Sequence, residues 1–305
     1  MLDIPYFKLA VLGIFAFCTT HVHRRGSVRL RFWRQLTDHS TFMAPINCVM
    51  YLFSGVPNRP FLDAAAFPQL RLLESHWESI RDEAYRLASA GQIKASDKYD
   101  DAGFNSFFKT GWTRFHLKWY DEAHPSARAL CPLTTSLLQQ IPSVKAAMFA
   151  ALPPGARLVT HRDPFAGSLR YHLGLSTPNS DDCFLCVDGE KYSWIDGQGV
   201  VFDETYLHHA ENRTPQMRII LFCDVERPLT NGLANTFNRF ISQTLIRSAA
   251  APNAATDRTG GFNRAFAHVQ RVRLLGKRIK ARSRFGYYLL KWLLFGGPIL
   301  WWLLS

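Results

Sequence analysis

Histidine, aspartate and arginine side chains gather in three short segments of one otherwise apolar stretch. His161 and Asp163 stand two residues apart, and the pair His208 and His209 follows about 45 to 50 residues later. Arg218 comes ten residues after His208. Two imidazoles and one carboxylate form the facial triad that binds non-haem Fe(II) and leaves positions open for a cosubstrate and dioxygen. A nearby arginine suits the distal carboxylate of 2-oxoglutarate, because a planar guanidinium pairs well with carboxylates.

The stretch SLRYHLGL adds two further polar side chains to this set. Side chains alternate between the two faces of a strand, so Arg170 and His172 are expected together on one face, opposite the leucines. The same rule points the adjacent His208 and His209 in opposite directions. Only one of these two histidines can therefore readily bind the metal.

The sequence around these residues predicts short strands, which must position them. Seven or eight apolar runs separated by turn residues predict an all-β sandwich or barrel, not a parallel βαβ sheet. The expected runs are VKAAMFAAL, RLVTH, SLRYHLGLS, CFLCVDG, KYSWIDG, GVVFDE and MRIILFCDV.

Helices are expected on both sides of this β core. Apolar residues at spacings of three and four predict one helix over residues 65–91, and a second is expected over 126–140, before Pro142. Residues after 230 return to a helical and increasingly basic pattern. The predicted regions are an N-terminal membrane segment (1–23), a helical and irregular support region (24–143), the catalytic core (144–229), a basic juxtamembrane region (230–284) and a C-terminal membrane segment (285–305).

Both ends of the chain are apolar. Each terminal segment approaches the roughly 20 apolar residues that a helix needs to cross a bilayer, and each could instead lie flat in the interface. The first segment lacks the cationic start and the cleavage site of a signal peptide. Arginines follow the first segment and precede the second, so the positive-inside rule places the intervening domain in the cytoplasm.

The formal net charge of +12 is concentrated beside these apolar ends. It favours an anionic membrane surface as a partner and argues against nucleic acid, because no nucleic-acid-binding motif accompanies it. The six cysteines lie mostly among apolar neighbours and are expected to be free thiols. Cys183 and Cys186 would face opposite sides of a strand, which argues against a zinc or redox site.

Three stretches resemble the aspartyl/asparaginyl β-hydroxylase family of 2-oxoglutarate-dependent dioxygenases. They are AMFAALPPGARLVTH, HRDPFAGSLRYHLGL and SWIDGQGVVFDETYLHHAENRTPQMRIILF. The resemblance implies a mainly β, α+β fold: a double-stranded β-helix (jelly-roll) core with flanking helices and membrane-associated termini. It also implies Fe(II) as cofactor, with 2-oxoglutarate and O2 as cosubstrates.

Within this family, RQLTDHSTFMAPINCVMYLFSGVP, FCDVERP and the apolar ends are similar to bacterial enzymes that 2-hydroxylate a secondary acyl chain of lipid A. This similarity implies lipid A or another acyl lipid as substrate. It also implies an inner-membrane protein whose catalytic domain lies on the cytoplasmic side.

The family pattern, carried onto this chain, makes His161, Asp163 and His208 the iron ligands and so selects His208 over His209. Vertebrate peptidyl hydroxylases of the family lack the carboxylate, whereas this chain has the full triad. Arg218 matches the arginine that pairs with the distal carboxylate of 2-oxoglutarate.

Three further positions are interpreted through the same pattern. His172 matches a histidine near the metal-proximal carboxylate of the keto acid. Arg170 matches a position that contacts substrate in the peptide hydroxylases; its alternative role is to neutralise Asp182 or Asp203. Ala150 stands where those enzymes have a serine, which leaves more of the keto-acid binding to Arg218.

Two other functions stay open at this stage. One is hydroxylation of an aspartyl or asparaginyl side chain of a protein, and the other is a non-enzymatic membrane scaffold with a barrel domain. The intact set of polar residues argues against the scaffold. Outside this set, Trp194 is expected in the core, and His116 and His124 are expected to be structural or surface groups.

Overall fold

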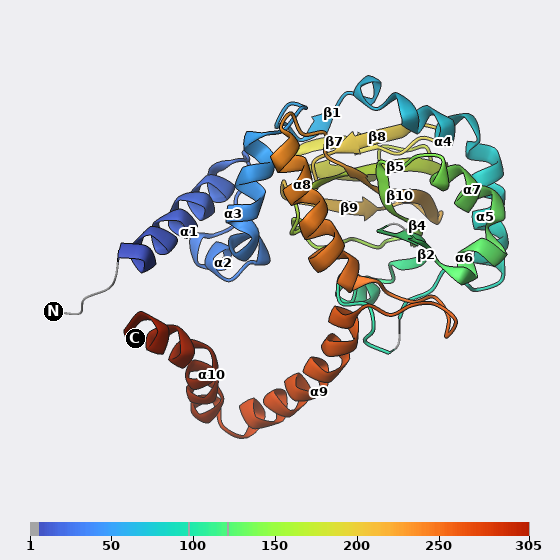
Figure 1. The fold of residues 1–305 in the computed structure, drawn as a ribbon. Helices are drawn as coiled ribbons and strands as arrows, with labels where there is room; N and C mark the ends of the chain where they lie inside the picture. The colour runs from blue at the N-terminus through green and yellow to red at the C-terminus, as the bar shows by residue number, and fades with distance from the viewer. Residues whose placement is uncertain (1–5, 97, 121, 305) are drawn as a thin grey trace.

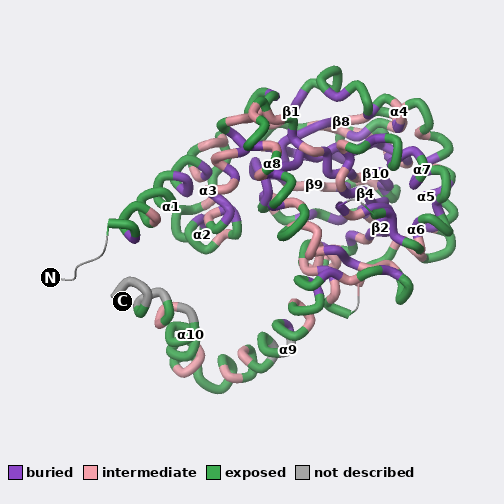
Figure 2. The backbone as a smooth tube through the Cα atoms, in the orientation of Figure 1, coloured by how far each residue is buried: buried purple, intermediate pink, exposed green. Residues whose placement is uncertain are grey.

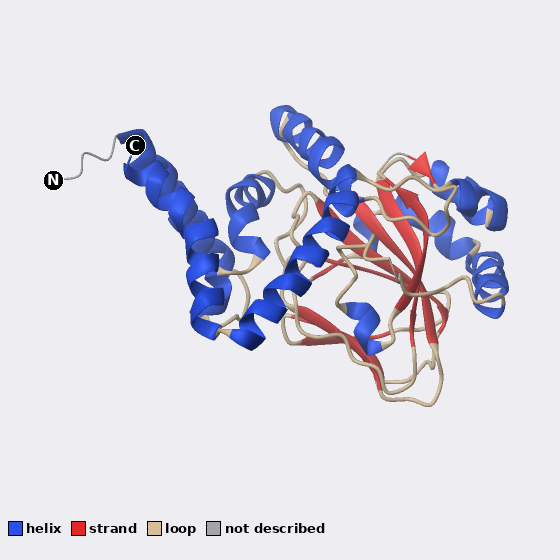
Figure 3. Cartoon of the chain, turned by 90° about the horizontal axis from the view of Figure 1, so that it is seen from below, coloured by secondary structure: helices blue, strands red, loops and turns tan. Residues whose placement is uncertain are grey.

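The computed structural model describes residues 6–96, 98–120 and 122–304. Two antiparallel sheets face each other and form a jelly-roll core that helices flank (Figures 1 and 3). The larger sheet has seven strands in the order β1-β8-β5-β10-β4-β2-β3, and the smaller has three in the order β7-β6-β9. The strands are β1 (Phe61–Leu62), β2 (Thr113–Trp119), β3 (Glu122–Ala123), β4 (Val144–Leu152), β5 (Ser168–Ser176), β6 (Cys183–Val187), β7 (Glu190–Ser193), β8 (Gly199–Phe202), β9 (His208–Asn212) and β10 (Arg218–Glu226).

Helices precede and follow this β core. The α-helices are α1 (Tyr6–Arg24), α2 (Phe32–Leu36), α3 (His39–Leu52), α4 (Arg71–Ser75), α5 (Trp77–Ser89), α6 (Pro125–Leu130), α7 (Pro132–Gln139), α8 (Gly232–Ile241), α9 (Gly261–Arg282) and α10 (Arg284–Leu304). Short 3-10 turns are η1 (Ala64–Ala66), η2 (Pro68–Leu70), η3 (Phe107–Thr110) and η5 (Arg247–Ala249), and η4 (Ser242–Ile246) is a π-helical turn.

The central strands of the large sheet are buried on both faces because each face packs on a different layer. On β4 and β10, Phe149 and Leu221 belong to the cluster formed with α5 and α7. Met148, Ala150 and Ile220 belong to a second cluster, shared with the small sheet. Alternate residues of a strand point to opposite faces, so one apolar strand contributes to both cores. In Figure 2 these strands are largely buried, whereas α1, α9 and α10 are mostly exposed.

The strand predictions are confirmed for most runs, with two differences. The run RLVTH (157–161) is no continuous strand; it makes single bridges, Arg157 to Glu211 and His161 to His208. The large sheet also extends beyond residues 144–229, because β1 pairs with β8, and β2 pairs with β4 and β3. β4 thus has a neighbour on each edge, which a strand buried on both faces needs to satisfy its backbone groups.

Both predicted helices are interrupted. The first is divided into η1, η2, α4 and α5, and α5 begins after His76, whose φ of −115° and ψ of 16° are not helical. The second is divided into α6 and α7 at Cys131, which has a φ of −133°. Cys131 precedes Pro132, and a proline disfavours the helical conformation of the residue before it.

The terminal helices project from the same side of the core (Figures 1 and 3). By length and composition, α1 is able to cross a membrane. Its C-terminal end packs on α3, where Cys18 and Val22 form a small cluster with Ala44 and Met50. The C-terminal helix α10 contains Pro298.

Candidate functional site

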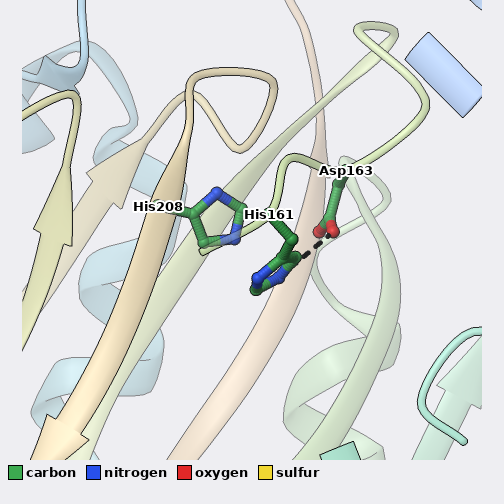
Figure 4. Close-up of side chains that lie close together, drawn as sticks. All are labelled: His161, Asp163 and His208. Carbon is green, nitrogen blue, oxygen red and sulfur yellow. Dashed lines mark ion pairs between the residues drawn. The ribbon is translucent and has the colours of Figure 1, made fainter. Parts of the chain in front are cut away.

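His161, Asp163 and His208 lie together at one end of the space between the sheets (Figure 4). Each offers one ligand atom, and these atoms all lie within 4.8 Å of one another. The Nε2 atom of His161 is 3.8 Å from Oδ1 of Asp163, and the two imidazole ring centres are 4.2 Å apart. The structure therefore brings together the three side chains that the sequence analysis selected.

Direct backbone pairing holds the two histidines side by side. The His161 amide donates to the carbonyl of His208 (3.0 Å), and the His208 amide donates back to His161 (2.7 Å). The Asp163 amide donates to the carbonyl of Glu204 (2.8 Å). The segment that carries His161 thus lies along β9, and this pairing brings residues distant in the chain to bonding distance of one ion.

The ring orientations suit metal binding. Nδ1 of His161 lies 2.7 Å from the Val159 carbonyl, and Nδ1 of His208 lies 3.0 Å from the Tyr206 carbonyl. An imidazole that donates through Nδ1 keeps its Nε2 lone pair for a metal. Burial lowers the pKa of both rings, for His208 to about 3, so both are neutral at pH 7. Two such nitrogens and one carboxylate oxygen fit Fe(II).

A buried arginine holds the carboxylate of the cluster. Arg170 pairs with Asp163 and Glu204, and its Nη1 lies 3.3 Å from Asp224. Burial raises the pKa of Glu204 and of Asp224. Burial would also raise the pKa of Asp163, but Arg170 and the two histidines keep it below its usual value. Asp163 is therefore ionised at pH 7.

Arg170 does not neutralise Asp182 or Asp203, the acids that the sequence suggested. Asp203 instead pairs with Arg25 and Arg227. Glu204 and Asp224 were missed by the sequence analysis. Asp224 lies directly opposite Arg170 in the β10–β5 register, and a polar residue within the apolar run RIILFCDV was the available signal.

Arg218 lies in the same pocket and lacks a carboxylate partner among the described residues. It is 2% exposed, and its Nε and Nη2 atoms make no hydrogen bond. Its guanidinium carbon lies 4.4 Å from the centre of the Trp194 ring. Burial lowers its pKa to about 10, so it remains a cation at pH 7. A buried and uncompensated cation is costly, which favours an anionic ligand at this position.

His172 extends this unpaired region. Both of its ring nitrogens are buried without a hydrogen-bond partner, and its ring stacks on Phe222 at 5.0 Å. Burial, with the neighbouring arginines, lowers its pKa well below the usual value. A neutral ring can donate one hydrogen bond to a ligand carboxylate. Arg170 and His172 share the inward face of β5, as alternation predicts.

Aromatic side chains form the remaining wall of this pocket. Phe104, Phe107 and Trp112 pack on one another, and the Phe107 ring lies 4.6 Å from that of His161. The free volume is about 40 Å³, small for an organic ligand. These aromatic residues precede the predicted core and were not among the predicted site residues.

The remaining predicted positions are structural in this fold. His209 is half-buried, and its ring lies 6.1 Å from that of Phe184, on the strand face opposite to His208. Trp194 is fully buried in the core beneath Arg218. His116 is also buried, with Nε2 3.3 Å from Asp101.

Comparison with known proteins agrees with this geometry. The aspartyl/asparaginyl β-hydroxylase family model matches residues 74–228. An ornithine lipid ester-linked acyl 2-hydroxylase of Rhizobium tropici is 30% identical over 199 residues, 65% of this chain and 69% of the relative. The human aspartyl/asparaginyl β-hydroxylase is 27% identical over 52% of this chain, and the match spans only 21% of the human protein.

Among solved structures, the prolyl 4-hydroxylase of Pseudomonas putida aligns with 51% of this chain and 88% of its own, at a TM-score of 0.34 and 18% identity. The matched family segment, residues 74–228, begins within α4 and ends after β10, and it contains every residue that lines the pocket around the two histidines. The chain belongs to the aspartyl/asparaginyl β-hydroxylase family and is a hydroxylase of that family.

Proposed function

We propose that this protein is a membrane-associated dioxygenase that depends on Fe(II) and 2-oxoglutarate and hydroxylates the 2-position of an acyl chain of lipid A. The observation that carries the proposal is the unpaired Arg218 cation, buried in the pocket that also contains His161, Asp163 and His208. His161, Asp163 and His208 can hold a metal, and the buried Arg218 favours an anion beside it.

The chain's own residues divide the work in this proposal. His161, Asp163 and His208 hold Fe(II), and Arg170 keeps Asp163 ionised and oriented toward it. Arg218 binds the distal carboxylate of 2-oxoglutarate, a pairing that is strong away from water. When bound, Fe(II) supplies the redox chemistry in which O2 and 2-oxoglutarate become succinate, CO2 and the oxygen atom of the new C–OH group.

A lipid substrate is supported by the relative from Rhizobium tropici, whose name gives an ester-linked acyl chain as its target. It is also supported by large apolar side chains that stay exposed on α2 and α3, which contact α1, and on α8, which contacts α3. Trp33 is 78% exposed, Phe42 74% and Leu233 83%. Such a surface is unfavourable in water and suits insertion into the interface of a bilayer.

The location follows from charge and from these apolar elements. Arg24 and Arg25 directly follow the apolar part of α1, and α9 carries a series of basic residues before α10. By the positive-inside rule, the core lies on the cytoplasmic side of the inner membrane. The basic segments then face the anionic lipid surface.

The test is an assay of the purified full-length chain in detergent with Fe(II), 2-oxoglutarate and O2. Lipid A precursor, ornithine lipid and an aspartate-containing peptide are offered separately, and mass spectrometry measures the gain of one oxygen atom. The proposal requires this gain on the lipid A acyl chain. If only ornithine lipid gains an oxygen atom, ornithine lipid and not lipid A is the substrate. If only the peptide gains an oxygen atom, the assignment of a lipid substrate is refuted.

Two variants connect the assay to the site. His208→Ala should remove both iron binding and product, because it deletes one of three ligands. His209→Ala should retain both, because His209 lies on the opposite face of β9. Oxygen insertion by the His208→Ala protein at the rate of the unmodified chain would contradict the proposed metal site.

A further inference from the structure

A second cavity, of about 330 Å³, lies outside the core site where α9 begins against the edge of the large sheet. Its wall combines the β2–β3 edge and the start of α6 with η4, η5 and the first turn of α9. From this point α9 leads away from the core toward α10 (Figure 1). The cavity is large enough for a small organic or inorganic ligand.

The cavity is strongly basic. Arg247, Arg258 and Arg264 line it, and Glu122 is the acidic residue among its lining residues. Nη2 of Arg247 lies 3.3 Å from Oε1 of Glu122, so this pair is internally neutralised. Arg258 and Arg264 form no ion pair with an acidic residue among those that the structure describes. Two positive charges are therefore left for a ligand.

The first turn of α9 adds backbone donors to these cations. The helix has 22 residues, no acidic residue in its first turn and no side-chain cap at Gly260. Uncapped N-terminal amides and the helix dipole favour an anion, and phosphate is one of the anions that such helix ends bind.

The start of α9 is fixed against the cavity wall. The Gly260 amide donates to Ala250 (2.9 Å), and a Cβ atom at Gly260 would lie 2.1 Å from the Ser248 carbonyl oxygen. The Asn263 side chain donates to the carbonyls of Ala249 (2.7 Å) and Ala250 (2.9 Å). Only glycine permits this close approach, so the helix terminus is held in one place.

A buried histidine supplies an independent indication of a ligand. His124 lines the cavity and is 5% exposed, and its buried Nε2 atom has no hydrogen-bond partner among the residues that the structure describes. Its Nδ1 atom lies 3.9 Å from Asp257. Burial lowers the His124 pKa to about 4, so the ring is neutral at pH 7 and able to donate one hydrogen bond. Buried polar atoms are rarely left unpaired without a reason.

We propose that this cavity binds a phosphate group between Arg258, Arg264 and the first turn of α9. Arginine suits this ligand because its planar fork can contact two phosphate oxygens at once. The group can be free phosphate or the headgroup of a membrane lipid. The proposal is independent of the hydroxylase chemistry in the core.

The first test measures binding of inorganic phosphate to the full-length chain in detergent by titration calorimetry. Arg258→Gln and Arg264→Gln should each weaken binding about tenfold or more, since a charge-assisted contact contributes at least ~1.4 kcal/mol. Arg128→Gln is the matched control, because Arg128 is an exposed arginine of α6 outside the cavity. A double variant carries both Arg258→Gln and Arg264→Gln. Equal phosphate binding by this double variant and by the control would overturn the proposal, as would no phosphate binding by the unmodified chain.

A second test separates the two sources of phosphate, using vesicles of phosphatidic acid in phosphatidylcholine. If a lipid headgroup is the ligand, the double variant is retained less than Arg128→Gln, and inorganic phosphate competes with retention of the unmodified chain. If free phosphate is the ligand, the double variant and the control are retained equally, while only the double variant loses phosphate binding. Unchanged circular dichroism and hydroxylase activity in detergent show that the double variant is folded.

Discussion

Two buried groups of charges in this protein are arranged in opposite ways. In the closed cluster, formed by Arg25, Asp203 and Arg227, Asp203 pairs with both arginines. In the open site, formed by Arg218 and His172, the cation and the ring nitrogens lack partners among the described residues. Burial disfavours an unpaired charge, so the closed cluster has a structural role, whereas the open site is suited to a ligand.

The closed cluster also connects the N-terminal helix to the core. Arg25 directly follows α1 and lies over the rings of Tyr51 (3.9 Å) and Tyr206 (4.0 Å). Thr205 donates to the other oxygen of Asp203. The N-terminal helices are thereby joined to the segment between β8 and β9, directly before His208. Arg170 stands between the two arrangements, because it is paired with carboxylates but one of them is Asp163.

The largest expected effect is on stability. Asp203→Asn leaves two buried arginines without a carboxylate and should lower the free energy of unfolding by about 3 to 5 kcal/mol. Chemical denaturation of the full-length chain in detergent measures this loss. Asp182→Asn is the control, because Asp182 is exposed and should leave stability unchanged. Equal stability of both variants would show that the closed cluster is not structural.

The open site should behave in the opposite way. Arg218→Gln removes an unpaired buried charge, so stability should be retained or raised, while the KM for 2-oxoglutarate should increase about 10- to 100-fold through loss of a charge-assisted pair. Steady-state kinetics and denaturation give the two values. Arg213→Gln, an exposed arginine before β10, should change neither. If Arg218→Gln destabilises the protein and leaves the KM for 2-oxoglutarate unchanged, Arg218 has a structural role and does not bind the ligand.

Arg170 tests the comparison further, because in the proposed site it holds the ligand Asp163 and is not itself a metal ligand. Arg170→Lys keeps the charge but not the planar fork, and iron affinity should fall about tenfold or more, as for other groups that orient a metal ligand. Equilibrium dialysis of Fe(II) measures this affinity, and the 2-oxoglutarate KM serves as the internal control. An altered KM at unchanged iron affinity would indicate direct ligand contact.

The smallest effect concerns pH. Burial alone would raise the pKa of Asp203, but Arg227 and Arg25 lower it below the ordinary value of about 3.9. A depressed carboxyl pKa adds stability that is complete above the unfolded-state pKa and is lost as pH falls toward the folded-state pKa. The stability difference between the unmodified chain and Asp203→Asn should therefore be constant from pH 7 to about 5 and shrink below about 4. A difference that grows toward acid would exclude the ion pairs as its cause.

Local rules of the sequence were sufficient for several features. Alternation along SLRYHLGL placed Arg170 and His172 on one face. The residue types and their spacing predicted a site with His161, Asp163 and one of two histidines, and the family resemblance selected His208. Turn residues marked the core strands. Pro132 also predicts the break between α6 and α7, because a proline disfavours the helical conformation of the residue before it. The predicted helix over 126–140 did not include this break. The strand faces, the turns and the break before α7 depend on neighbours in the chain, and so they can be derived without knowing which strands pair.

Only the tertiary structure decided which buried side chains pair with one another and which strands are neighbours. Strand alternation assigns a side chain to a face but not to a neighbouring strand, so the pairing of Arg170 with Glu204 and Asp224 was not predictable. The same limit applies to the bridge between His161 and His208. It also applies to strands β1, β2 and β3, which join the large sheet from outside the predicted core. Sequence determined which groups point inward; only the register of the sheets determined which of them are neutralised, and hence that Arg218 stays unpaired.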